Sequence, residues 1–168
     1  MRFLLLLIGF IFIPPAQALP TPTGPVILSF SGHISEKNTD NKALFDREML
    51  EDLPQHSFIT STPWLKTPHK YSGVSAVDIL KLIGGKGTIL RITALNKYVI
   101  EVPISDFVKY GAIFSIRKDD QFISIRNLGP IMVMYPFDSN PTLQNETFYW
   151  RAIWQANTIE VLTDPTKE

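Results

Sequence analysis

The stretch Ile125-Arg126-Asn127-Leu128-Gly129-Pro130-Ile131-Met132-Val133-Met134-Tyr135-Pro136 joins a polar turn to an apolar segment. Gly129 has no Cβ and lets another group approach the backbone closely, and Pro130 fixes the direction in which the chain leaves the turn. The apolar run 131–133 predicts a buried strand that anchors the turn. We interpret the stretch as a binding loop that leads into a core strand; the alternative is an ordinary turn before such a strand.

Short strands and short helices are predicted on both sides of this stretch. Asp46, Ser75 and Ser105 are suited to cap helices, because their side chains can accept hydrogen bonds from first-turn N–H groups, and Ser75 with Asp78 fits a capping box. Residues 64–71 are expected to form a loop. Strands are predicted at 26–32, 56–62, 90–94, 98–102, 113–117, 122–125, 131–133 and 158–162, and helices at 46–53, 75–83 and 105–110. This mixture predicts an α+β fold with one domain at 26–163, an extended leader at 19–25 and a tail at 164–168.

The first 18 residues have the pattern of a secretory signal peptide. One positive charge at Arg2 precedes the apolar run 3–13, and Ala16-Gln17-Ala18 is a small-x-small cleavage signal. The apolar run is shorter than the roughly 20 residues that a membrane-spanning helix needs. We therefore expect cleavage after Ala18, a periplasmic location and no membrane insertion.

Composition excludes several classes of function. Sixteen basic and sixteen acidic residues leave no net charge, so nucleic acid is not an expected partner. The chain has no cysteine, and its three histidines, His33, His56 and His69, fall at no metal-ligand spacing. Ser75 is interpreted as a helix cap rather than a nucleophile, and 84–88 as a helix stop rather than a phosphate loop. We expect no metal site and no catalytic residue.

Aromatic side chains and hydrogen-bond donors gather in the predicted loops. An aromatic plate stabilises a stacked heterocycle, on the scale known for bases, by about 1 to 3 kcal/mol, and fixed donors can read the edge of the ring. The pattern favours a flat ligand, and the alternative for each aromatic residue is a place in the core. The residues that carry this pattern are Trp64, Tyr71, Tyr135, Tyr149, Trp150, Arg126, Asn127 and Arg151.

The order of four segments resembles the molybdopterin-binding domain of the sulfite oxidase family, in its small periplasmic, single-domain form. These segments are 71–80, which resembles the family's aromatic-x-Gly segment opening a helix; 98–103; 128–133, which resembles its glycine-proline loop and strand; and 149–161. The similarity runs from about Phe30 to Leu162. It implies a mixed-sheet sulfite oxidase-type fold and a pterin pocket.

The family's molybdenum-binding cysteine would lie within 59–64 of this chain. Thr60, Ser61 and Thr62 stand there instead, and a hydroxyl is a poor substitute for a soft thiolate. Molybdenum is therefore not expected. Candidates for holding a cofactor phosphate are few: Arg91, Arg117, Arg126 and Arg151.

The sequence is similar to cysteine-free members of this fold that look like periplasmic pterin-binding proteins. The resemblance implies a reduced pterin such as a tetrahydropterin as ligand, and as partner the periplasmic domain of a membrane-bound diguanylate cyclase or phosphodiesterase that controls cyclic-di-GMP. One of Asp106, Asp119, Asp120 and Asp138 could read the ligand edge. The expected pterin-binding residues are Thr60, Ser61, Thr62, Trp64, Tyr71, Arg126, Asn127, Gly129, Pro130, Tyr135, Trp150 and Arg151.

Two alternatives to a non-catalytic binding protein stay open. The first is a molybdopterin-dependent oxidoreductase or a subunit of one. The second is a structural interaction module whose ancestral pocket has closed.

Overall fold

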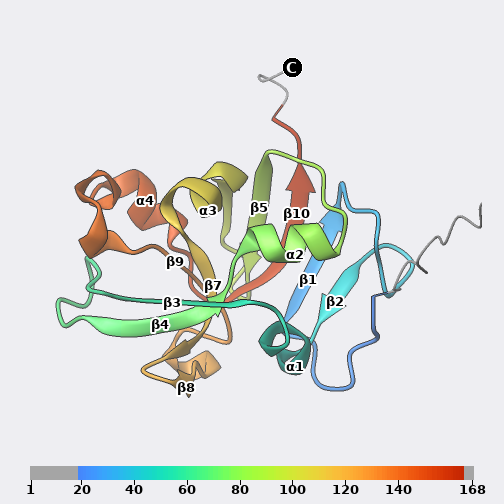
Figure 1. Ribbon diagram of the computed structural model, residues 1–168, viewed down its shortest axis with the longest axis horizontal. Helices are drawn as coiled ribbons and strands as arrows, with labels where there is room; N and C mark the ends of the chain where they lie inside the picture. Colours follow the sequence, from blue (N-terminus) through green and yellow to red (C-terminus); the bar gives the residue numbers. More distant parts are fainter. Residues whose placement is uncertain (1–18, 165–168) are drawn as a thin grey trace, which may run out of the picture.

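The computed structural model describes residues 19–164, so the predicted signal peptide and residues 165–168 of the predicted tail lie outside the described residues. Two five-stranded sheets and four short α-helices make up an α+β fold (Figure 1). In Figure 1 the strands of the first sheet stand upright, and β3 and β4 of the second sheet cross them at a steep angle. The fold class predicted from the sequence is confirmed.

The first sheet has the strand order β2-β1-β10-β5-β6. β1 and β10 pair in parallel, and all its other pairs are antiparallel, so the sheet is mixed. Because the parallel partners are the first and last strands of the fold, closing this sheet requires nearly the whole chain. Its strands are β1 (Leu28–Gly32), β2 (Ala43–Phe45), β5 (Ile89–Ala94), β6 (Val99–Pro103) and β10 (Ala156–Leu162).

The second sheet has the order β3-β4-β7-β8, and β9 also pairs with β7. β9 contains the apolar residues that follow the opening turn, and all three are buried, as the sequence predicts. Its strands are β3 (Gln55–Thr60), β4 (His69–Val74), β7 (Ile113–Lys118), β8 (Gln121–Phe122) and β9 (Met132–Met134).

The core lies where the two sheets meet. Phe30 of β1 is fully buried and packs edge to face against Phe45 of β2 and against Phe114 of β7, with ring centroids 5.9 and 6.2 Å apart. Since Phe114 belongs to the second sheet, this aromatic group joins the two sheets directly.

Local capping chemistry explains several helix boundaries. Asp46 and Ser75 cap α1 and α2 as predicted, each accepting a hydrogen bond from a first-turn N–H. The prediction that Ser105 caps the third helix is wrong: α3 begins after Pro103, without a side-chain cap, and ends at left-handed Gly111. No helix among residues 19–164 is long and apolar enough to cross a membrane. The helices are α1 (Arg47–Glu51), α2 (Ala76–Leu82), α3 (Ile104–Tyr110) and α4 (Glu146–Arg151), with 3-10 turns η1 (Ile125–Asn127), η2 (Phe137–Ser139) and η3 (Pro141–Leu143).

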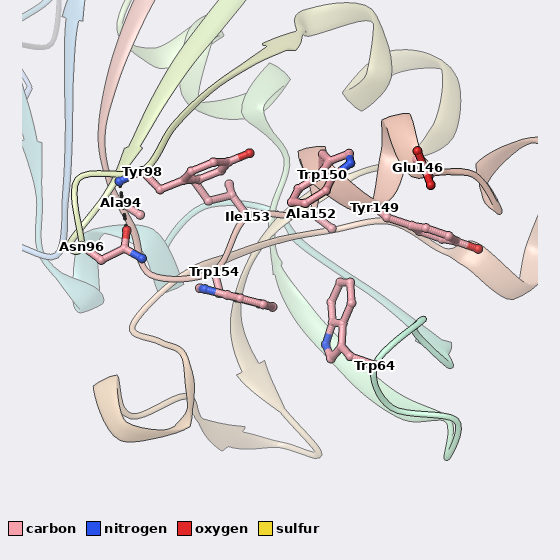
Figure 2. A pocket seen from close by; sticks show the side chains of 10 residues that line it. All are labelled: Trp64, Ala94, Asn96, Tyr98, Glu146, Tyr149, Trp150, Ala152, Ile153 and Trp154. Carbon is pink, nitrogen blue, oxygen red and sulfur yellow. Dashed lines mark hydrogen bonds between the residues drawn. The ribbon is translucent and has the colours of Figure 1, made fainter.

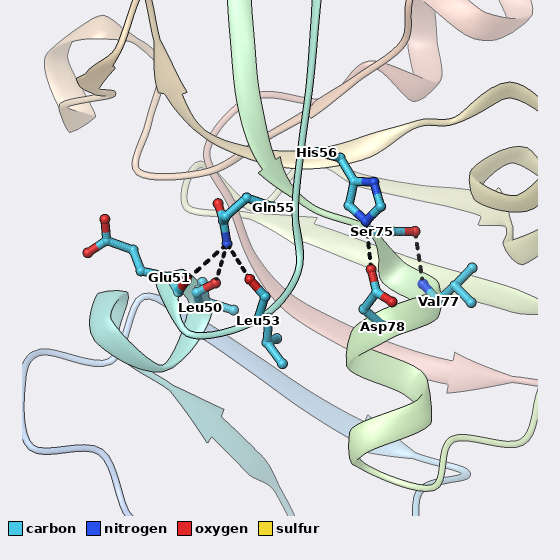
Figure 3. Close-up of polar contacts among 8 residues, drawn as sticks. All are labelled: Leu50, Glu51, Leu53, Gln55, His56, Ser75, Val77 and Asp78. Carbon is cyan, nitrogen blue, oxygen red and sulfur yellow. Dashed lines mark hydrogen bonds and ion pairs between the residues drawn. The ribbon is translucent and has the colours of Figure 1, made fainter.

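The start of β3 is fastened to two helices (Figure 3). Gln55 Nε2 donates to the carbonyls of Leu50 and Leu53, each at 2.9 Å, and so satisfies acceptors at the end of α1. His56 Nε2 lies 2.8 Å from Asp78 Oδ2 of α2. Asp78 is therefore engaged across the fold rather than in the predicted capping box.

Four elements differ from the sequence prediction. Of the strand predicted at 122–125 only Phe122 is in β8, because the chain turns into η1 at Ile125. β4 occupies part of the predicted loop 64–71, because its polar residues pair with β3 on one side and β7 on the other. The edge strand β2 was not predicted. The aromatic residues of α4 form a helix, where only an aromatic-rich segment was expected. The predicted leader has no helix or strand at 19–25, and the N–H groups of Thr23 and Gly24 donate to Asp46 Oδ2, both at 2.8 Å.

An aromatic pocket as candidate functional site

A cavity of about 410 Å³ opens between α4, the β5–β6 turn and the loop after β3 (Figure 2). Its size falls in the range of roughly 300 to 1,000 Å³ that is common for small-molecule pockets. Half of the ten residues that line it are aromatic. The lining consists of Trp64, Ala94, Asn96, Tyr98, Glu146, Tyr149, Trp150, Ala152, Ile153 and Trp154.

Backbone contacts fix the wall that contains Trp154. Val133 N of β9 donates to Ile153 O at 2.8 Å, and Met132 forms an isolated bridge with Trp154. β9, the buried strand predicted from the opening stretch, therefore holds the Trp154 wall of the pocket in place. The opposite wall is α4, whose first turn is capped by Asn145 Oδ1 accepting from Thr147 N at 2.9 Å.

Two indoles meet at right angles inside the pocket. The rings of Trp64 and Trp154 are edge to face, with centroids 5.6 Å apart and an interplanar angle of 88°. Trp64 Nε1 is buried and has no hydrogen-bond acceptor among the described residues. An unpaired buried donor costs about 1 to 3 kcal/mol, and such groups in native proteins call for an explanation. Trp64 Nε1 is therefore a donor in the pocket lining that lacks an acceptor among the described residues.

The polar groups of the pocket are few and carry no positive charge. Asn96 already accepts a hydrogen bond from Tyr98 N at 3.0 Å through its Oδ1. Glu146 is the one ionisable carboxylate in the lining, and neither lysine nor arginine lines the cavity. The pocket therefore combines aromatic plates with a single acceptor-only group, a combination that suits a flat heterocycle with N–H groups on its edge.

Trp64 and Trp150 are the two predicted site residues that line this pocket. Trp150 is 65% exposed, so its indole is available to a ligand rather than packed in the core. The pocket also contains Tyr98, Glu146 and Trp154, which the sequence analysis did not single out as site residues. The four-residue spacing from Glu146 to Trp150 would have placed these two on one face of a helix, had α4 been recognised.

The three hydroxyl residues at the expected cysteine position have structural contacts. Thr60 and Thr62 are buried. Ser61 donates to Asp138 twice at 2.6 Å, from its N–H and its hydroxyl, and these bonds hold the pKa of that carboxyl below its usual range. Asp138 N in turn donates to Thr60 Oγ1 at 3.1 Å, so the group ties the end of β3 to η2.

Tyr135 and Arg151 meet at a buried carboxylate rather than at the pocket. Tyr135 Oη and Arg151 Nη1 both donate to Asp106 Oδ2, at 2.8 and 3.0 Å. Burial, followed by the charge of Asp106, raises the pKa of Tyr135 well above its ordinary value. Tyr71 is also fully buried, in the core.

The turn at Arg126, Asn127, Gly129 and Pro130 lies beside the pocket without lining it. Gln155, next to Trp154, donates from its backbone to Leu128 O and from its side chain to Ile125 O, both at 3.0 Å. Gly129 lets the backbone at Ile123 approach closely, because a Cβ at position 129 would lie 2.1 Å from Ile123 O. The turn thus supports the Trp154 wall.

The four aspartates considered as edge readers are all engaged elsewhere. Asp119 binds His69 at 2.7 Å, Asp120 binds Lys70 at 2.8 Å, and Asp106 and Asp138 have the contacts described above. Glu146 has the position in the pocket that was expected of one of them.

The residues present do not fit a molybdenum-loaded molybdopterin. The chain offers no thiolate, and the hydroxyls at 60–62 are hard donors with structural hydrogen bonds. No group of three potential metal ligands occurs among residues 19–164. Of the candidate phosphate binders, Arg91, Arg117 and Arg151 are in ion pairs, and Arg126 does not line the pocket.

The chain has an α+β, sulfite oxidase-type fold. This fold defines the class of proteins with which the chain can be compared. Among solved structures it is similar to the sulfane dehydrogenase SoxCD from Paracoccus pantotrophus, with a TM-score of 0.60 and 11% identity. The match covers 80% of this chain and 37% of that one, so the chain spans well under half of its neighbour. No family model matches the sequence, and no curated protein matches it either. At this identity the similarity concerns the fold alone.

Proposed function

We propose that this protein is a non-catalytic binding protein for a pterin, held in the aromatic pocket. The observation that carries the proposal is the pocket itself, in which two indoles at right angles, an exposed third indole and one carboxylate surround a cavity of about 410 Å³. The aminopyrimidine ring of a reduced pterin is flat and offers both a carbonyl acceptor and an edge rich in N–H groups.

The chemistry of the lining matches these features one by one. A ring stacked on Trp150 would gain about 1 to 3 kcal/mol, on the scale known for nucleobases. The carbonyl is the type of acceptor that the unpaired Trp64 Nε1 lacks. Absence of a redox-active ligand set in the lining supports binding rather than catalysis as the role of the pocket.

The wider setting of this proposal comes from the sequence. Export to the periplasm rests on the signal-peptide pattern of residues 1–18. The resemblance to cysteine-free pterin-binding proteins supports a signalling role, in which the loaded protein contacts the periplasmic domain of a membrane-bound diguanylate cyclase or phosphodiesterase and so controls cyclic-di-GMP.

A second candidate, a molybdopterin-dependent oxidoreductase or its subunit, is favoured by one observation, the fold similarity to a dehydrogenase. The missing thiolate and the lack of cations in the pocket argue against it. It ranks second for that reason.

Binding is tested by titrating the purified protein with a tetrahydropterin in the absence of oxygen. Calorimetry and tryptophan fluorescence monitor the titration. We expect saturable one-to-one binding, weakened at least tenfold, or about 1.4 kcal/mol, by Trp150→Ala. Because Trp150 is 65% exposed, this variant should remain folded. Val108→Ala is a matched control, since Val108 is 69% exposed on α3, outside the pocket. Absence of saturable binding by the unaltered protein would overturn the proposal.

A further inference from the structure

The carboxylate of Glu146 lies at the edge of the aromatic pocket and has no protein partner among residues 19–164. Glu146 is the first residue of α4, yet the capping of that helix is done by its neighbour Asn145. No hydrogen bond or ion pair joins the side chain of Glu146 to any residue in the described part of the chain, whereas the side chains of the four aspartates considered above all have such contacts. Its side chain is free to meet a ligand.

The helix places this carboxylate beside an aromatic plate. Glu146 and Trp150 are four residues apart in α4 and therefore share one face of the helix. Figure 2 shows both side chains on the same wall of the pocket. A ring stacked on Trp150 would present its edge to Glu146.

A carboxylate accepts hydrogen bonds and donates none. Its two oxygens match two parallel N–H groups, such as the 2-amino group and the N3–H of an aminopyrimidine, and charge-assisted bonds of this kind are about twice as strong as neutral ones. A ring with a carbonyl at position 2 would instead set oxygen against oxygen. The carboxylate of Glu146 thus distinguishes a ring edge with a 2-amino group from one with a 2-oxo group.

The same lining disfavours anionic ligands. A phosphate on the ligand would enter a cavity with no lysine or arginine in its wall and with the negative charge of Glu146 nearby. Removing that phosphate from water without a partner is costly. Arg151 of the same helix does not compensate, because it is paired with Asp106.

We infer that Glu146 is the specificity-determining residue of the pocket, and that it selects a phosphate-free pterin by binding the aminopyrimidine edge. This inference rests on the proposed function and goes beyond it by naming the reader of the ligand edge and the ligands that the pocket rejects.

The test uses three probes: 6-hydroxymethyl-tetrahydropterin, its phosphate monoester, and its analogue with a 2-oxo group in place of the 2-amino group. The unaltered protein should bind the first at least tenfold more tightly than each of the others. Glu146→Gln keeps the shape of the side chain but replaces one acceptor oxygen by a donor NH₂. We expect it to weaken binding of the pterin at least tenfold and to bring the pterin and its 2-oxo analogue within about threefold of each other.

Glu48→Gln is the matched control. Glu48 is likewise an exposed acid in the first turn of a short helix, so this variant makes the same change of net charge far from the pocket lining. It should bind all three probes as the unaltered protein does.

The outcomes separate the two proposals. If the unaltered protein binds the pterin and Glu146→Gln binds it equally well with the same preference over the 2-oxo analogue, the role of Glu146 is overturned and the proposed function stands. Equal or tighter binding of the phosphate monoester would overturn the exclusion of phosphate. If none of the probes binds to the unaltered protein, both proposals fail.

Discussion

Tyr135 donates a buried hydrogen bond of 2.8 Å to Asp106, across 29 residues of sequence. The same carboxylate oxygen accepts from Arg151 of α4 at 3.0 Å, and the Asp106 side chain is only 5% exposed. This contact fastens α4, and with it Glu146 and Trp150, to α3 and to the chain that leaves β9. The Tyr135–Asp106 pair therefore positions one wall of the pocket.

Replacing Asp106 should cost more than replacing Tyr135. Asp106→Ala leaves Arg151 partly buried without its partner, and we expect a loss of about 3 to 5 kcal/mol in the free energy of unfolding. Tyr135→Phe removes one hydrogen bond to a charged group, which contributes about 1.5 to 3 kcal/mol. Urea unfolding measures both. Equal losses of unfolding free energy for the two variants would contradict the conclusion that Asp106 serves both donors.

Stability should fall at alkaline pH because of Tyr135. Its pKa is raised in the folded protein, first by burial and then by Asp106, so its contribution is complete below the ordinary pKa of 10.0 and is lost as the pH rises. The free energy of unfolding should decline above about pH 10. The free energy of unfolding of the Tyr135→Phe variant should decline less steeply. It should still decline, because burial also raises the pKa of Tyr71. Identical slopes for the two proteins would refute this assignment.

Asp46 should stabilise the protein except in acid. Its carboxylate accepts hydrogen bonds from Met49 N at 3.0 Å and from Gly24 N and Thr23 N at 2.8 Å, and these bonds hold its pKa below the ordinary 3.8. The contribution is present above pH 3.8 and is lost as the pH falls through the lowered value. Asp46→Ala should cost about 1 to 2 kcal/mol at neutral pH. The difference from the unaltered protein, measured by urea unfolding, should shrink in acid; a constant difference would count against the mechanism.

Gly129 should tolerate no side chain. A Cβ there would lie 2.1 Å from the backbone oxygen of Ile123, a residue whose N–H donates to Ile116 O of β7 at 3.1 Å. We expect Gly129→Ala to cost about 3 kcal/mol or more in thermal or urea unfolding. Gly111→Ala is the comparison, since nothing lies within 4 Å of its Cβ position and only the left-handed φ of +67° opposes the change, at about 1 to 2 kcal/mol. A smaller loss for Gly129→Ala than for Gly111→Ala would be inconsistent with the structure.

Local chemistry made part of the fold predictable. Asp46 and Ser75 cap their helices because a short acceptor side chain next to an apolar stripe suffices to mark a helix start, and Gly111 marks a helix end by its left-handed backbone. The buried strand after Pro130 followed from its apolar run. These signals depend only on neighbouring residues.

Other elements depend on partners far away in sequence. β4 begins His69-Lys70 and has no apolar alternation, and it is a strand because β3 and β7 pair with it on both sides. α4 contains Phe148, Tyr149 and Trp150, residues that favour strands by intrinsic preference. Its helical form rests on the Asn145 cap and on packing of Phe148 against Tyr135.

The site was predictable only in part for the same reason. Trp64 and Trp150 stood out as aromatic residues in loops, but the perpendicular pairing of Trp64 with Trp154 joins segments 90 residues apart and leaves no local pattern. The aspartates were equally ambiguous, since a turn residue and a ligand reader look alike in sequence. Glu146 became visible as a candidate only once α4 had placed it beside Trp150.

The most direct test of the account is the identity of what the protein carries when it is exported natively and purified under reducing, oxygen-poor conditions. The protein is denatured, the released small molecules are analysed by mass spectrometry and fluorescence, and molybdenum is measured by elemental analysis. We predict a phosphate-free pterin in near-equimolar amount and no stoichiometric molybdenum. Equimolar molybdenum with a phosphorylated pterin would contradict the account and favour the oxidoreductase.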